Sequence, residues 1–153
     1  MKRITLSVLM IVLVIGLIGC TAENTNTTQV SQEVSYEDGT YRGTFSDGGV
    51  MQVGVQFKLE KNIVKEAQMR HLEYRDTNYL KEETDETLMG LTKQYEELLG
   101  YLVDKDIRES IASMYEPGDI VKEEVDGFTG ATIRAGKIIS AVRDGLNRGV
   151  YSY

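Results

Sequence analysis

The sequence predicts an α+β protein, in which a small antiparallel sheet comes first and helices that pack on it come afterwards. Two observations predict this order. Residues 51–59 alternate between apolar and polar side chains, and short turns separate them from strand-like segments on either side, which is typical of strands joined in hairpins. Residues 84–103 and 131–147 carry apolar side chains every three or four positions, which is typical of helices packed on one face. Strands followed by helices define an α+β layout.

The clearest expected strand covers residues 51–59. Its apolar side chains occupy every second position and should face the core: Met51, Val53, Val55, Phe57 and Leu59. Short turns rich in Gly, Asp, Asn and Lys separate this segment from two further expected strands, at residues 40–45 and 63–71. Three strands joined by short turns predict an antiparallel sheet.

Three helices are expected after the sheet. The first covers residues 84–103, with Thr84 as a candidate N-cap, and the second is a short helix at residues 107–114 that ends before Pro117-Gly118. The third covers residues 131–147. Its expected buried stripe is Ala135, Ile138, Ile139, Val142 and Leu146, and its basic side chains are expected to lie away from that stripe: Arg134, Lys137, Arg143 and Arg148.

The N-terminal 20 residues have a different character from the rest. The basic segment Met1-Lys2-Arg3 precedes an uncharged apolar run at residues 4–19. This run is shorter than the roughly 20 residues of a membrane-spanning helix and matches a secretory signal peptide. It ends in Leu17-Ile18-Gly19-Cys20, which resembles a bacterial lipobox. The resemblance implies cleavage before Cys20 and lipid attachment to its sulfur; the alternative is an uncleaved anchor with an incidental cysteine.

These features predict three segments. Residues 1–19 form a lipoprotein signal peptide, residues 20–36 comprise the lipidated Cys20 (diacylglyceryl and palmitate) and a flexible polar tether, and residues 37–153 form the folded domain. Acyl chains that insert into a bilayer hold a small domain at its surface. The expected location is therefore the extracytoplasmic face of the cell membrane.

The composition excludes several classes of chemistry. The chain has 24 acidic and 17 basic side chains, one Cys and one His, with a formal net charge of −7. One Cys cannot form an intramolecular disulfide or an iron–sulfur cluster, and His71 alone cannot supply a multi-histidine metal site. The acidic charge argues against nucleic acid as a partner. No metal site is expected, and a redox role requires an organic cofactor.

One segment combines turn residues with hydroxyl groups. In Asp126-Gly127-Phe128-Thr129-Gly130-Ala131-Thr132, the two glycines permit a turn, and Asp126 or Thr129 is placed to cap the helix expected from residue 131. Thr132 would lie in or near the first turn, where unpaired N–H groups and the positive end of the helix favour phosphate. An ordinary capped helix start has the same pattern. The residues alone leave both interpretations open.

The pattern Asp-x-x-Thr-Gly-Ala-Thr at residues 126–132 resembles the flavinylation motif of the FMN-binding domain family. That motif occurs in subunits of sodium-pumping and ferredoxin-linked membrane oxidoreductases and in lipoproteins of extracellular electron transfer. The resemblance implies that a flavin transferase joins the phosphate of FMN to the Thr132 hydroxyl as a phosphoester, and that the transferase recognises Asp126. It also implies that Thr129, Gly130 and Ala131 complete the cofactor site.

The resemblance covers about residues 38–146 and departs from the family pattern at one position. Residues 38–43, Gly48-Gly49 and the alternating strand at residues 51–59 resemble the family's opening strand pair. Many members have Ser or Thr two residues past the modified threonine, where this chain has Arg134. Arg134 is a candidate partner for the phosphate, and Phe128, inside the motif, is the candidate for contact with the flavin ring.

Together these features favour an electron carrier over an enzyme with its own substrate, because FMN accepts one or two electrons. The expected partners are the flavin transferase, the membrane that holds the lipid anchor, and a quinol-linked or flavin reductase in that membrane as electron donor. Two alternatives remain open. One is a lipoprotein that binds or senses FMN non-covalently, and the other is a purely structural surface lipoprotein.

Overall fold

The computed structural model describes residues 34–122, 125 and 127–152. Four strands come first in the chain: β1 (Gly39–Asp47), β2 (Met51–Glu60), β3 (Ile63–Tyr74) and β4 (Thr77–Asn78). The helical elements follow: η2 (Tyr79–Lys81), α2 (Glu86–Gly100), α3 (Ile107–Ser113), η3 (Pro117–Asp119) and α4 (Gly127–Arg148). The α+β class predicted from the sequence is confirmed.

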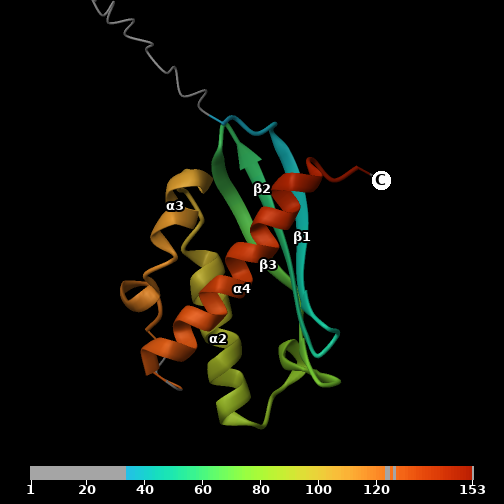
Figure 1. The fold of residues 1–153 in the computed structure, drawn as a ribbon, viewed down its shortest axis with the longest axis vertical. Helices are drawn as coiled ribbons and strands as arrows, with labels where there is room; N and C mark the ends of the chain where they lie inside the picture. The colour runs from blue at the N-terminus through green and yellow to red at the C-terminus, as the bar shows by residue number, and fades with distance from the viewer. Residues whose placement is uncertain (1–33, 123–124, 126, 153) are drawn as a thin grey trace, which may run out of the picture. The chain divides into compact units, whose positions relative to one another are not determined.

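The strands form one antiparallel sheet in the order β1-β2-β3-β4. β1 and β2 pair without interruption from Gly39↔Leu59 to Asp47↔Met51, whereas the β2–β3 pairing shifts register twice. The longer helices α2 and α4 cover one face of this sheet, and α4 crosses β1 and β2 diagonally (Figure 1). In the described part of the chain, the helices therefore cover one face of the sheet.

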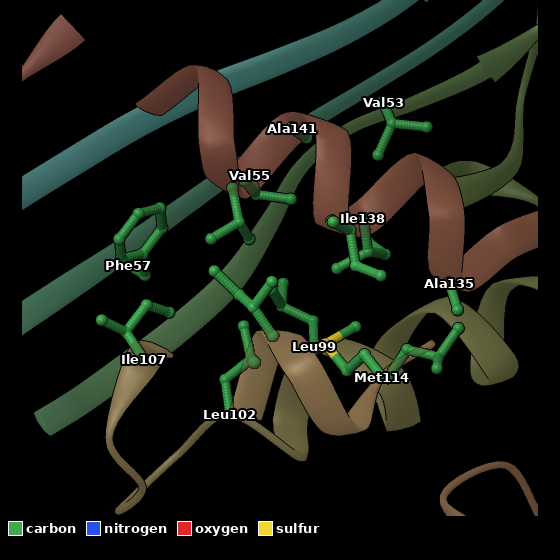
Figure 2. Close-up of a cluster of buried hydrophobic side chains, with 14 of the residues drawn as sticks. Val53, Val55, Phe57, Leu99, Leu102, Ile107, Met114, Ala135, Ile138 and Ala141 are labelled. Carbon is green, nitrogen blue, oxygen red and sulfur yellow. The ribbon is translucent and has the colours of Figure 1, made fainter. Parts of the chain in front are cut away.

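The core lies between the covered face of the sheet and the helices. The predicted inward face of β2 is confirmed, because Met51, Val53, Val55, Phe57 and Leu59 are all buried. Figure 2 shows Val53, Val55 and Phe57 together with core residues of the helices and of the segments that follow α2 and α3: Leu99, Leu102, Ile107, Met114, Ala135, Ile138 and Ala141. The stripe predicted for the last helix is buried in full.

The C-terminal half of α4 is fixed to β1 at very short range. A Cβ atom on Gly43 would lie 1.9 Å from the carbonyl oxygen of Ala141 and 2.4 Å from the backbone nitrogen of Gly145. Beside this contact, the carboxylate of Asp144 accepts hydrogen bonds from the backbone N–H of Thr44, at 2.8 Å, and from its hydroxyl. This attachment fixes the direction in which the N-terminal half of α4 leaves the sheet.

The first predicted helix begins later than expected and has a different cap. α2 starts at Glu86, and the side chain of Asp85 accepts a hydrogen bond from the N–H of Leu88 at 3.0 Å, so Asp85 is the N-cap. The prediction of Thr84 as the cap is wrong. Its hydroxyl instead donates to the carboxylate of Glu82 at 2.7 Å, within the turn before the helix.

The predicted signal peptide and most of the predicted tether, Cys20 among them, lie outside the described residues. In the part of the chain that the structure describes, none of the helices combines the length and the apolar content needed to cross a bilayer. The expected boundaries at residues 19, 20 and 36 stay predictions.

Candidate functional site

The motif forms the beginning of α4 and does not precede it. α4 starts at Gly127, about four residues before the predicted start, so Thr129 is the third helical residue and is not the N-cap. Gly127 and Gly130 do not interrupt the helix, because first-turn N–H groups have no intrahelical partner to lose. Asp126 immediately precedes α4 but lies outside the described residues. Its predicted roles as cap and as recognition residue stay predictions.

Small side chains allow this helix start to pack closely against the domain. Gly130 is buried, and Ala131 is 5% exposed. Thr132 follows as the sixth residue of α4 and is exposed. The structure thus places the predicted attachment residue where another protein can reach it. The side chains of Phe128 and Thr129 are outside the described part of the structure, so their expected contacts with the cofactor stay predictions.

The sequence predicted that Arg134 lies away from the buried stripe of α4. This prediction is wrong, because Arg134 is buried. It is 7% exposed, and its Nε donates a hydrogen bond to Oε1 of Gln94, which lies on α2 and is 1% exposed. A guanidinium group tolerates burial when its donors are hydrogen-bonded. The sequence contained one signal for this contact, because Gln94 is a polar residue within the apolar stripe of α2, between Leu91 and Leu98.

Lys137 lies one turn beyond Arg134 on the same side of α4. It is partly buried, and this burial lowers the pKa of its ammonium group; repulsion from Arg134 acts in the same direction, while Asp47 at the end of β1 opposes both. Among the described residues, the Lys137 side chain has no ion pair or hydrogen bond. A cation that is partly desolvated in this way is stabilised by an additional anion. We call Arg134 and Lys137 the cation pair.

Tyr79 of η2 interacts electrostatically with Arg134. Burial raises the pKa of Tyr79, the neighbouring Tyr74 raises it further, and Arg134 acts to lower it. The backbone carbonyl of Tyr79 accepts a hydrogen bond from the Thr92 hydroxyl at 3.2 Å, which attaches η2 to α2. Neither η2 nor Lys137 was among the sequence-predicted site features.

These residues fit a phosphate-bearing organic cofactor. The start of α4 combines the positive end of a helix with an exposed threonine, Thr132, and on the next turn Lys137 is a partly buried cation that an anion would stabilise. Within the described ranges no three His, Cys, Asp or Glu side chains are grouped so that they could hold a metal ion. The fold and the site define a small α+β domain suited to an anionic organic ligand.

Comparison with known proteins makes this class more specific. The model of the FMN-binding domain family matches residues 48–147, which is more than half of the chain and includes the motif, α2 and most of α4. The chain belongs to the FMN-binding domain family, and it is a flavoprotein with FMN as its cofactor. Searches of curated proteins and of solved structures found no significant match.

Proposed function

We propose that this protein is a membrane-anchored, extracytoplasmic electron carrier whose FMN is attached covalently to Thr132. The observation that carries the proposal is the exposure of Thr132 on the second turn of α4, inside the segment that the family model matches. An exposed threonine residue is accessible to a modifying enzyme. The buried Gly130 and Ala131 beside it anchor the backbone that presents it.

Attachment forms one phosphoester bond and breaks one phosphoanhydride bond. The oxygen of the Thr132 hydroxyl bonds to the phosphorus of an activated flavin phosphate, the anhydride partner leaves, and the hydroxyl proton is released to solvent. The cation pair and the N-terminal end of α4 favour the negative charge of the flavin phosphate. Asp126 contributes to recognition by the transferase.

The bound cofactor supplies one- and two-electron chemistry, and the protein supplies its location. A covalent bond prevents loss of FMN to the medium outside the cell. The lipid on Cys20 and the polar tether of residues 20–36 let the domain move between a quinol-linked or flavin reductase in the membrane and an outer acceptor. This arrangement suits a carrier better than an enzyme with its own substrate.

The test is expression of the full chain with and without a flavin transferase, followed by denaturing electrophoresis and in-gel flavin fluorescence. We expect a fluorescent band only with the transferase, and none for Thr132→Ala. Ser140→Ala is the matched control, because Ser140 is an exposed hydroxyl residue on the same helix. A fluorescent Thr132→Ala band would contradict attachment at Thr132. Flavin released by denaturation would favour non-covalent binding, and no flavin at all would favour the structural alternative.

A further inference from the structure

Thr132 shares one edge of α4 with Gly136 and Arg143. Each residue of a helix advances about 100° round the axis, so Gly136 and Arg143 lie within about 40° of Thr132. All three residues are exposed. The buried Ile139 lies about 20° from Thr132 on the other side, so this edge borders the packed face of the helix. A group attached to Thr132 therefore starts where the exposed surface of α4 meets its packed side.

The segment after α3 lies beside this edge. The guanidinium carbon of Arg143 is 5.6 Å from the centre of the Tyr115 ring, and η3, two residues after Tyr115, contacts α4 (Figure 1). Arg143 is about three turns from Thr132, and helical side chains lean back towards the start of their helix, by roughly one turn here. The Arg143 head group, with Tyr115 beside it, is therefore about two turns, or ~11 Å, along the edge from Thr132.

Tyr115 is an exposed aromatic side chain on a fixed backbone. Met114 before it is 0% exposed, and Pro117 shortly after it is buried. The N–H of Tyr115 donates a hydrogen bond to the carbonyl of Ala112 at 3.4 Å. The side chain of Tyr115 is nevertheless 53% exposed. An aromatic ring held in this way can bind a second flat ring with little loss of conformational freedom.

Gly136 leaves space on this edge between Thr132 and the head group of Arg143. A Cβ atom on Gly136 would have no atom of the described residues within 4 Å. Glycine destabilises an exposed helix interior relative to alanine, and no close backbone contact requires it here. Gly145 differs, because its Cβ would lie 3.2 Å from the backbone of β1. Ile133, a surface neighbour of Gly136 on the helix, is 54% exposed. Free space beside apolar side chains suits a flat, largely apolar ring.

We propose that the isoalloxazine ring carried by Thr132 lies over Gly136 and stacks on Tyr115. This inference rests on the proposed covalent attachment. The ribityl phosphate arm and the three fused rings of FMN together are longer than the separation along this edge, so the ring reaches Tyr115. Arg143 positions the Tyr115 ring through its cation–π contact, and Ile133 adds apolar surface. Tyr115 contacts the cofactor and takes part in no covalent step.

The experiment uses the full chain coexpressed with the transferase. Flavin retained after denaturation measures loading, and time-resolved fluorescence of the folded protein measures the fraction of flavin quenched by a stacked tyrosine. Tyr115→Leu should lower the ratio of docked to undocked flavin about fivefold, as expected for loss of one aromatic stacking contact. Tyr115→Trp should retain quenching, because tryptophan also stacks and quenches. Tyr151→Leu is the matched control, because Tyr151 is an exposed tyrosine beyond the end of α4 with an arginine, Arg42, 3.9 Å from its ring centre.

A second pair of variants tests the space over Gly136. Gly136→Leu fills this space and leaves Tyr115 intact, so it should also lower the quenched fraction. Asn147→Leu introduces the same side chain at an exposed position near the C-terminal end of the same helix and should leave the quenched fraction unchanged.

Other outcomes overturn the inference in distinct ways. Equal quenching in the unmodified protein and in Tyr115→Leu would place the ring elsewhere. The same loss of quenching in Tyr151→Leu would assign the effect to the fold and not to stacking. Full quenching in Gly136→Leu would overturn the position over Gly136. Absence of denaturation-resistant flavin from the unmodified chain would overturn the proposed covalent attachment, and the docking with it.

Discussion

At the scale of single residues, Arg134 and Gln94 depend on each other. Each is a buried polar side chain between α2 and α4. Their hydrogen bond offsets the free-energy cost of removing both side chains from water. Periodicity assigned Arg134 to the solvent side because a pattern of polar and apolar residues contains no information about partners. A polar residue inside the apolar stripe of one helix, such as Gln94, is the signal that a buried partner exists on another.

We therefore expect Gln94→Leu to lower the free energy of unfolding by about 1–3 kcal/mol, because it removes the acceptor for a buried guanidinium donor. The measurement is urea denaturation followed by circular dichroism. In Gln94→Leu/Arg134→Met, both polar groups are absent, so the loss should be smaller than the sum of the two single losses. Strictly additive losses would show that the two side chains are not coupled.

The motif gave the site hypothesis its starting point. Its residues are consecutive, so Thr132 was proposed from the sequence without knowledge of the fold, and its attachment to FMN stays a prediction. Lys137 and Tyr79 were not proposed from the sequence, because their relation to Arg134 depends on the three-dimensional structure. Lys137 is five positions from Thr132, and Tyr79 belongs to a separate element more than 50 positions away.

At the scale of elements, the major strands and helices were predictable, and the short elements were not. β4 contains two residues and pairs with β3 through a turn in which Arg75 and Asp76 have positive φ angles of 47° and 66°. Such a turn usually has Asn or Gly at these positions, so Arg-Asp gives no signal. The early start of α4 was missed because two glycines indicated a turn, although a helix tolerates them in its first residues.

Two glycine substitutions should have opposite effects on stability, because Gly43 packs against α4 and Gly136 lies on the exposed side of α4. Gly43→Ala places a methyl group against the backbone of α4, so it should cost about 3 kcal/mol or more of unfolding free energy. Gly136→Ala meets nothing within 4 Å and should stabilise the exposed helix by up to about 1 kcal/mol. Thermal unfolding of both variants tests this. A Gly43→Ala melting temperature equal to that of the unmodified protein would refute the close packing.

The hydrogen bonds in the turn before α2 predict that the stability of the folded protein decreases at acidic pH. Hydrogen bonds from the Thr84 hydroxyl and from the N–H groups of Thr84 and Asp85 hold the pKa of Glu82 at about 2. Because this pKa is depressed in the folded state, the stabilisation is complete above the unfolded value near 4.3 and is lost as the pH falls towards 2.

Melting temperatures between pH 2 and pH 6 test this prediction. In Glu82→Gln the melting temperature should depend less on pH than in the unmodified protein. In the matched control, Glu83→Gln, this pH dependence should be unchanged. The prediction is wrong if the two variants have the same pH profile.

At the scale of the whole molecule, the domain carries the cofactor and the N-terminal segment is expected to determine where it works. The family match to residues 48–147 identifies the FMN-binding domain, and the resemblance to a lipobox predicts the anchor. Since the lipid is proposed to be attached to Cys20, the unmodified chain should incorporate a labelled fatty acid and Cys20→Ala should not. Absence of label from the unmodified chain would favour an uncleaved anchor.

The most direct test of covalent attachment is tandem mass spectrometry of the flavinylated protein after digestion with trypsin. Cleavage after Lys122 and Arg134 yields a peptide of residues 123–134 that contains both threonines of the motif. We predict that this peptide carries one FMN group and that its fragment ions place the group on Thr132. An unmodified peptide from flavin-containing protein, or fragment ions that place the FMN on Thr129, would contradict attachment at Thr132.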